Sequence, residues 1–208
     1  MCGRYEFSKS FGEEFNFVQW PNFQPDLNIS PTNKAPVIVE TNPNSYEVEF
    51  RHWGFIRHWP GKTGKLTKKI LFNAVSESIT KTRSFKHAFA ERRCVIPLNA
   101  WFEWPEIPEI NNGIKTKIRI FMPMRPTFGA AGIYEDTIDK ETGEVTSFFS
   151  MLTVEPGQNS PIKSLHDRSP LVLPAHEYDT WLTGTPGQAE SLLHPYETPG
   201  AFDFEILY

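Results

Sequence analysis

The 208-residue sequence contains only two cysteines, Cys2 and Cys94. So few cysteines exclude a disulfide framework, and a zinc site would need other ligands. The first residues hold no apolar segment typical of an export signal, and no run approaches the roughly 18 apolar residues of a membrane span. We therefore expect a cytoplasmic protein that has free thiols and uses neither a metal nor another cofactor.

The sequence also lacks repeats, low-complexity tracts and the excess of charge that marks disordered chains. Hydrophobic residues make up 39% of the chain and aromatic residues 14%, which is enough apolar side chain for one core at this length. We predict a single domain over residues 1–208 that is monomeric and has no obligate protein partner.

Acidic residues are scarce in one part of the chain. Residues 51–100 contain eleven Lys or Arg and two acidic residues, which gives this segment a net charge of +9. Because the whole chain has a net charge of −4, the remaining 158 residues have a net charge of −13. Cations, histidines and aromatic residues are interleaved from Arg51 to Trp59. Because bases stack on aromatic rings while cations neutralise phosphates, this segment favours binding of single-stranded nucleic acid; the alternative is a solvated basic face.

Short runs of β-branched and aromatic residues predict a protein built mostly of strands. The strand-like runs are 2–7, 36–40, 46–50, 94–98, 100–104, 117–122, 128–134 and 147–154. Helical patterns cover 8–17, 84–92, 176–182 and 188–193, with a turn near 161–165. Since the strands cluster without regular alternation with helices, we predict an α+β fold on a mixed, largely antiparallel sheet with peripheral helices. Residues 105–116 and 136–146 are expected to form loops or hairpin turns.

Three polar side chains stand out as candidate site residues. Glu103 lies within the predicted strand 100–104, on the same face as Trp101, and is therefore expected to be partly buried. A buried carboxyl group either pairs with an arginine or has a shifted pKa at a functional site. Asn73 follows the basic run, and His166 lies two residues before Arg168. Taken alone, each has an ordinary structural explanation.

Seven segments, in order from residue 2 to about residue 183, together resemble the SRAP family, the SOS-response-associated peptidases that shield abasic DNA. They are Cys-Gly-Arg (2–4), LNISPT (27–32), WGFIRHW (53–59), FNAVSES (72–78), TRSFKHAFAERRCVIPLNAWFEW (82–104), FGAAGIYE (128–135) and SLHDRSPLVL (164–173). The resemblance implies a single α+β domain around an antiparallel sheet, with a positively charged groove for single-stranded DNA.

The resemblance also implies covalent capture of an abasic site by Cys2 after self-processing removes Met1, with lyase activity as a related reaction. Once Met1 is gone, Cys2 carries an α-amine with a pKa of about 7.7 to 8.0 beside a thiol with a pKa of about 8.5. The amine can form an imine with the open-chain sugar aldehyde, and the thiol can close on the same carbon to a thiazolidine. Only an N-terminal cysteine offers this ring.

The family's catalytic positions match three further residues. His166 suits proton transfer near neutral pH, Glu103 would hold or deprotonate the Cys2 ammonium, and Asn73 would position the reacting groups by hydrogen bonds.

The same resemblance assigns contacts with the DNA strand. It implies that phosphates are bound by Arg4, Arg83 and Arg168. Trp59 would stack near the displaced strand or junction, and Pro31 would line the wall beside the lesion.

The sequence departs from the family pattern at two positions. Val75 stands where an arginine is common, so an expected phosphate contact is missing. Arg57 stands where proline is frequent, and we predict that it contacts DNA. Either a cation at another position replaces the missing phosphate contact, or the protein binds DNA more weakly.

Two other functions stay open at this point. A cysteine peptidase acting on proteins would use Cys2 as nucleophile and His166 as base, but its nucleophile need not be terminal. A non-catalytic module for single-stranded DNA would need only the basic, aromatic segment. It would bind intact and abasic strands equally and form no adduct that resists denaturation.

Overall fold

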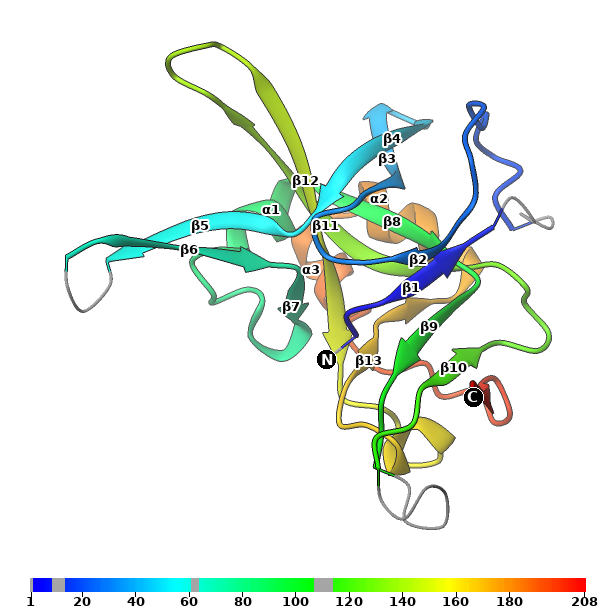
Figure 1. Cartoon of the computed structure of the whole chain (residues 1–208). Coiled ribbons are helices and arrows are strands. Elements are labelled where there is room, and N and C mark those ends of the chain that lie inside the picture. Colours follow the sequence, from blue (N-terminus) through cyan, green and yellow to red (C-terminus); the bar gives the residue numbers. More distant parts are fainter. Residues whose placement is uncertain (1, 9–13, 61–63, 107–113) are drawn as a thin grey trace.

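The computed structural model describes residues 2–8, 14–60, 64–106 and 114–208. Within these ranges, fifteen strands form an eight-stranded sheet, a five-stranded sheet and a two-stranded hairpin, with a few short helices (Figure 1). This arrangement confirms the predicted α+β fold with peripheral helices.

The eight-stranded sheet follows the order β13-β12-β4-β3-β8-β11-β14, and β7 pairs with β12. Because β11 also pairs with β12, five of these strands close into a ring. The sheet is mixed, since β12 runs parallel to β4 and β7 while its other pairs are antiparallel. Its strands are β3 (Lys34–Asn42), β4 (Ser45–Trp53), β7 (Asn73–Val75), β8 (Arg93–Leu98), β11 (Phe128–Ile138), β12 (Val145–Val154), β13 (Ser169–Pro170) and β14 (Val172–Leu173).

The five-stranded sheet is antiparallel throughout and has the order β15-β10-β9-β1-β2. Its strands are β1 (Tyr5–Phe7), β2 (Asp26–Ile29), β9 (Ala100–Glu103), β10 (Ile118–Phe121) and β15 (Asp203–Ile206). A single residue, Asn99, separates β8 in one sheet from β9 in the other. Its backbone N–H donates to Glu6 O (2.9 Å), and its side-chain amide donates to Pro126 O and Thr127 Oγ1. These bonds fix the point where the chain passes between the sheets.

Strands β5 (Phe55–Pro60) and β6 (Leu66–Leu71) form a hairpin that projects from the body, here called the arm (Figure 1). The arm starts at Gly54, which has φ +119°. A Cβ there would lie 2.4 Å from Ile70 Cγ2, so glycine is needed both for the backbone angle and for the close approach of β6. The sequence did not predict either strand of the arm.

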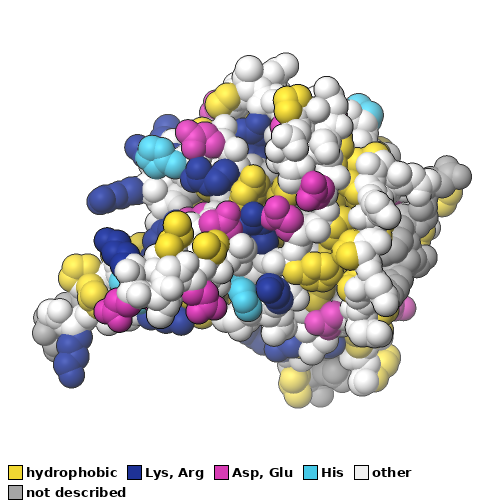
Figure 2. Space-filling model, turned by 90° about the horizontal axis from the view of Figure 1, so that it is seen from above, with side chains coloured by type: hydrophobic (Ala, Val, Ile, Leu, Met, Phe, Trp, Pro, Cys, Tyr) yellow, Lys and Arg dark blue, Asp and Glu magenta, His cyan; other side chains and the backbone are white. Residues whose placement is uncertain are grey.

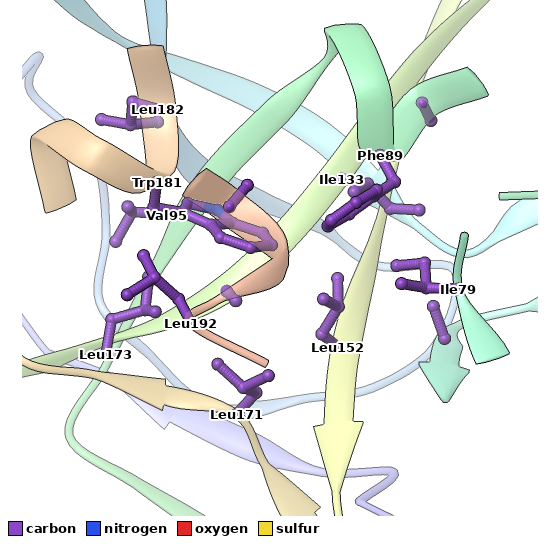
Figure 3. Packing of buried hydrophobic residues seen from close by; sticks show 14 of the residues in the cluster. Ile79, Phe89, Val95, Ile133, Leu152, Leu171, Leu173, Trp181, Leu182 and Leu192 are labelled. Carbon is purple, nitrogen blue, oxygen red and sulfur yellow. The ribbon is translucent and has the colours of Figure 1, made fainter. Parts of the chain in front are cut away.

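Two hydrophobic cores lie on opposite faces of the eight-stranded sheet. Successive strand residues point to opposite faces, so Ile38 and Val95 join one core while Val37 and Cys94 join the other. The first core is covered by the helices α1 (Lys86–Glu91), α2 (Tyr178–Thr183) and α3 (Pro186–Glu190). Figure 3 shows Trp181 of α2 packed into it, with its indole N–H donating to Cys94 O at 2.9 Å. The second core fills the space between the two sheets and contains Cys2.

The helix predictions are met to different degrees. The patterns at 84–92, 176–182 and 188–193 correspond to α1, α2 and α3 with shifted ends, and a turn of 3-10 helix spans Pro161–Ser164. Half of the predicted helix at 8–17, residues 9–13, lies outside the described residues; of the other half, Ser8 has no regular structure and 14–17 form a turn.

One of the two predicted loops is partly strand. Residues 139–144 form the turn between β11 and β12, and the strands themselves extend into the predicted loop on both sides. Of the other predicted loop, 107–113 lie outside the described residues, and Glu106 pairs with Lys115 across it. In the described part of the chain, no helix is long and apolar enough to cross a membrane.

Candidate active site

Cys2 lies where the two sheets meet, three residues before β1. Its side chain is fully buried. The thiol donates a weak hydrogen bond to Arg4 O at 3.7 Å, and the Cys2 carbonyl accepts one from Asn73 Nδ2 at 2.7 Å. Asn73 is the first residue of β7 in the eight-stranded sheet, so this bond joins the N-terminal segment to the other sheet.

Glu103 is the last residue of β9 and is 4% exposed. Its Oε2 lies 3.6 Å from His166 Nε2, and among the described residues nothing hydrogen-bonds its Oε1. Burial raises the pKa of Glu103 to about 7. The expected burial is therefore confirmed, and within the described structure its ion-pair neighbour is a histidine, so the arginine partner that we considered is wrong.

His166 follows the 3-10 turn Pro161–Ser164. Its ring nitrogen Nδ1, on the side away from Glu103, contacts the two residues that follow in the chain. The Arg168 backbone N–H and an Asp167 carboxylate oxygen both lie 3.0 Å from His166 Nδ1. Burial lowers the pKa of His166, although Asp167 opposes this effect. The imidazole is therefore mostly neutral near pH 7, with Nε2 on the side of Glu103.

The thiol itself stays protonated in this environment. Burial raises the pKa of Cys2 well above its usual range, and the negative charge of Glu103 adds to this effect. The structure thus brings together all four residues that the sequence marked as catalytic: Cys2, Asn73, Glu103 and His166. Asp167 is a further neighbour that sequence reasoning passed over, although its position next to His166 was visible.

Two of the six predicted DNA contacts lie close to this cluster in the chain, and both already have partners. Arg4 donates to Asn28 Oδ1 at 2.9 Å. Arg168 forms a two-pronged ion pair with Glu77, with both N–O distances 2.8 Å, and also donates to Thr153 O. Although partial burial opposes it, the hydrogen bonds from Arg168 lower the pKa of Glu77 to about 2. Glu77 thus offsets the Arg168 charge, a role that its place after Asn73 did not reveal.

Three other predicted contacts line one cavity of about 510 Å³ between the arm and residues 82–84: Arg57, Trp59 and Arg83. Arg83 is exposed, and Trp59 is 38% exposed with Lys69 Nζ 5.4 Å from its ring centre. Figure 2 shows dark-blue Lys and Arg side chains gathered on and beside the arm.

Arg57 differs from its two neighbours in that cavity. Its guanidinium donates twice to Glu135, at 2.5 and 2.6 Å, and also to Ile56 O and Ser84 O. Its four terminal N–H bonds therefore all have acceptors inside the protein.

The last predicted contact, Pro31, lies in the turn between β2 and β3. This turn is fixed by the N–H of Thr32, which has φ 80° and donates to Trp53 O at 2.8 Å. Val75, where the expected arginine is missing, is 41% exposed at the end of β7.

Cys2 is thus buried beside Asn73, with Glu103 and His166 close by, at the junction of two sheets in an α+β fold. The family model described as SOS response associated peptidase (SRAP) matches residues 1–205, and the chain belongs to this family.

Two curated relatives match nearly the whole chain. It is 31% identical over 218 residues to the abasic site processing protein YoaM of Bacillus subtilis (strain 168), covering 99% of this chain and 91% of that protein. It is 30% identical to the abasic site processing protein YoqW of Bacillus phage SPbeta, with 99% and 92% covered.

Solved structures share the fold. A protein from Bordetella bronchiseptica superposes with a TM-score of 0.81 at 21% identity, over 100% of both chains. A protein from Bacteroides thetaiotaomicron gives a TM-score of 0.72 at 26% identity, over 88% of this chain and 78% of that one.

Proposed function

We propose that the protein processes abasic sites in single-stranded DNA by binding them covalently through Cys2. The names of the curated relatives support the substrate class. The observation that carries the mechanism is the setting of Cys2: it is the second residue of the chain, its carbonyl is held by Asn73, and two buried acceptors, Asn73 Oδ1 and Glu103 Oε1, have no described partner. The N–H groups of a free Cys2 ammonium are the donors that such acceptors lack.

The first step is hydrolysis of the peptide bond between Met1 and Cys2. Water adds to the carbonyl carbon of Met1, methionine leaves, and Cys2 retains a free α-amine. The hydrogen bond from Asn73 holds the Cys2 carbonyl throughout, so the new amine stays beside Glu103.

The second step joins this amine to the sugar aldehyde. Glu103 takes a proton from the Cys2 ammonium, and the neutral amine attacks the aldehyde carbon to give a carbinolamine. Protonation of the carbinolamine hydroxyl by Glu103 then releases water and leaves an imine. A carboxyl group with a pKa near 7 suits both transfers at neutral pH, and His166, 3.6 Å away, can exchange a proton with it.

The third step closes the ring. The thiol adds across the C=N bond, so that sulfur bonds to the former aldehyde carbon and the thiol proton goes to nitrogen. Because the buried thiol is protonated, it supplies the proton that the nitrogen needs. Ring closure also competes with elimination of the 3′ phosphate from the imine, which would cut the strand as a lyase does.

Incubation with single-stranded DNA that carries one abasic site tests the proposal on a denaturing gel. We expect a shifted band for the wild-type protein and for Cys94→Ala, since Cys94 lies in β8 within the core between the sheets. We expect none for Cys2→Ala. Intact-mass measurement should show that most molecules of an active preparation lack Met1.

The outcomes separate the competing functions. Binding of abasic and intact strands without a shifted band would favour a simple DNA-binding module. Cleavage of an added protein that Cys2→Ala abolishes would favour a peptidase. Active protein that retains Met1 would contradict the imine step.

A further inference from the structure

The arm has two chemically different faces. Residues paired across its two strands share a face, so Ile56 with Ile70 and His58 with Lys68 lie on one side, here called the cavity face. The pairs Arg57 with Lys69 and Trp59 with Thr67 lie on the other side. The two predicted DNA contacts on the arm, Arg57 and Trp59, belong to this second side, so the cavity face has no assigned role.

A cavity of about 310 Å³ lies between the cavity face and the body of the protein. Ile56 and Ile70 line it from the arm, and Phe148 of β12 and His52 of β4 line it from the body. The rings of His52 and Phe148 are 6.0 Å apart. Lys68 reaches the same cavity from β6, and its side chain is exposed. Apolar and ring surfaces beside a cation suit a flat heterocycle that is attached to an anion.

The charge of the arm identifies the anion. Residues 53–72 contain five Lys or Arg and no acidic residue. A protein segment would be attracted to these cations only if it were strongly acidic. A DNA strand is attracted to them whatever its sequence, because each nucleotide carries one phosphate.

The cavity is also close to the candidate active site along the chain, although Phe148 belongs to the core on the opposite face of the eight-stranded sheet from Cys2. Strand β6 ends at Leu71, and two residues later Asn73 holds the Cys2 carbonyl. On the body side, Met151 pairs with Asn73, and Phe148 lies three residues earlier on the same strand. At about 3.3 Å per residue, this places Phe148 about 10 Å along β12 from Asn73, so a strand bound at Cys2 would reach the cavity by passing around the base of the arm over a few nucleotides.

We propose that this cavity binds a nucleobase of the DNA strand that carries the abasic site, with Lys68 at its phosphate. The inference rests on the proposed function, because it places the base near a lesion that Cys2 holds. It adds a site for an intact nucleotide to the site for the damaged one.

Wild-type protein and two unreactive strands test this directly. Both strands carry a tetrahydrofuran analogue of the abasic site; one keeps its neighbouring bases, and in the other the neighbouring nucleotides are tetrahydrofuran as well. Fluorescence anisotropy should show binding at least about five-fold weaker for the second strand, because stacking on each base adds affinity. Equal affinities would overturn the proposal without any mutation.

A matched pair of variants then assigns the effect to the cavity. Ile70→Ser should shrink the difference between the two strands, whereas Leu66→Ser, the same kind of change on the same face but outside the cavity lining, should leave it intact. Lys68→Ala should flatten the dependence of log affinity on log salt by about 0.7, the slope of one phosphate contact on a single strand. An equal loss in both serine variants would place the base elsewhere.

The cross-linking reaction of the wild-type protein is measured separately on a reactive strand. An adduct without base dependence would overturn the cavity alone. Base dependence without an adduct would overturn covalent capture and leave the cavity as a nucleobase site. Loss of the base effect when an acidic peptide competes, together with tighter binding of that peptide than of DNA, would identify a protein partner and overturn the proposal.

Discussion

At the scale of single residues, the site depends on placing a carboxyl group where water does not reach it. Glu103 ends a strand with the apolar sequence Ala-Trp-Phe before it, so the strand carries it into the interior. Its partner is a half-buried imidazole, whose neutral form does not offset a negative charge. Glu103 therefore carries a proton that it can donate near neutral pH. When this buried carboxyl group is ionised, it lowers the stability of the folded state.

The first prediction follows from that proton. The pKa of Glu103 rises from 4.5 to about 7 on folding, so the folded state binds the proton more tightly, and its free energy of unfolding falls as pH rises through this window. Glu103→Gln removes the buried charge and should raise the free energy of unfolding at pH 8 by about 2 kcal/mol, with little change near pH 4. Urea denaturation at the two pH values measures this. Equal stability of both proteins at pH 8 would mean that Glu103 ionises at its ordinary pKa.

At the scale of elements, the arm needs support that a two-stranded hairpin lacks by itself. Arg57 supplies it, because its guanidinium ties β5 to Glu135 on β11 and to Ser84 in the segment before α1. Because all four of its terminal N–H bonds have acceptors within the protein, Arg57 has a structural role in holding the arm. The prediction that it contacts DNA stays untested.

Glu135→Gln distinguishes the two roles. If Arg57 fixes the arm, the variant loosens it and should weaken binding of a tetrahydrofuran strand about two- to five-fold, as Arg57→Ala does, and the double variant should be no worse than either because the residues act as one unit. The salt slope should stay unchanged. Tighter binding by Glu135→Gln would instead show that the released guanidinium binds phosphate directly. Anisotropy titrations on the four proteins decide between these results.

The missing arginine at the end of β7 allows a separate prediction. Val75 is exposed, and the nearby Glu77 already has both carboxylate oxygens bound to Arg168, so a new cation at position 75 would stay free for a phosphate. Val75→Arg should raise affinity at low salt and steepen the salt slope by about 0.7. Val75→Met, of similar length but uncharged, is the control and should leave the slope unchanged. The same slope in all three proteins would mean that this edge of the sheet does not face the DNA.

The elements that the sequence predicted are those whose side chains carry a local pattern. β8, β9, β11 and β12 are apolar runs, and the four site residues lie in or next to segments that resemble a known family. The arm was missed because its strands alternate cations with a few apolar residues and, beyond Phe55 at its base, bury neither face. β7 and β15 were missed because they are short and gain their hydrogen bonds only from distant strands. The pairing of Arg57 with Glu135 and of Arg168 with Glu77 joins residues 78 and 91 positions apart, so no local pattern reveals it.

At the scale of the whole molecule, the two ends of the chain belong to one sheet. β15, near the C-terminus, pairs with β10, which pairs with β9, which in turn pairs with β1. Phe204 and Ile206 of β15 pack against the same core that contains Cys2 and Trp101. The strand that carries Glu103, β9, is thus paired on its outer side with β10, which in turn pairs with β15.

This arrangement predicts that β15 stabilises the site from a distance. Phe204→Ala combined with Ile206→Ala removes two half-buried side chains and should lower the free energy of unfolding by about 2 to 4 kcal/mol, measured by urea denaturation. Glu205→Ala is the matched control on the same strand: it breaks only an exposed ion pair with Arg119 (3.1 Å) and should change stability by less than about 1 kcal/mol. Because β15 touches neither Cys2 nor Asn73 by any described hydrogen bond, the double variant should form the covalent adduct in buffer and lose it at a lower urea concentration than wild type. Unchanged stability of the double variant would show that the outer edge of this sheet holds without β15.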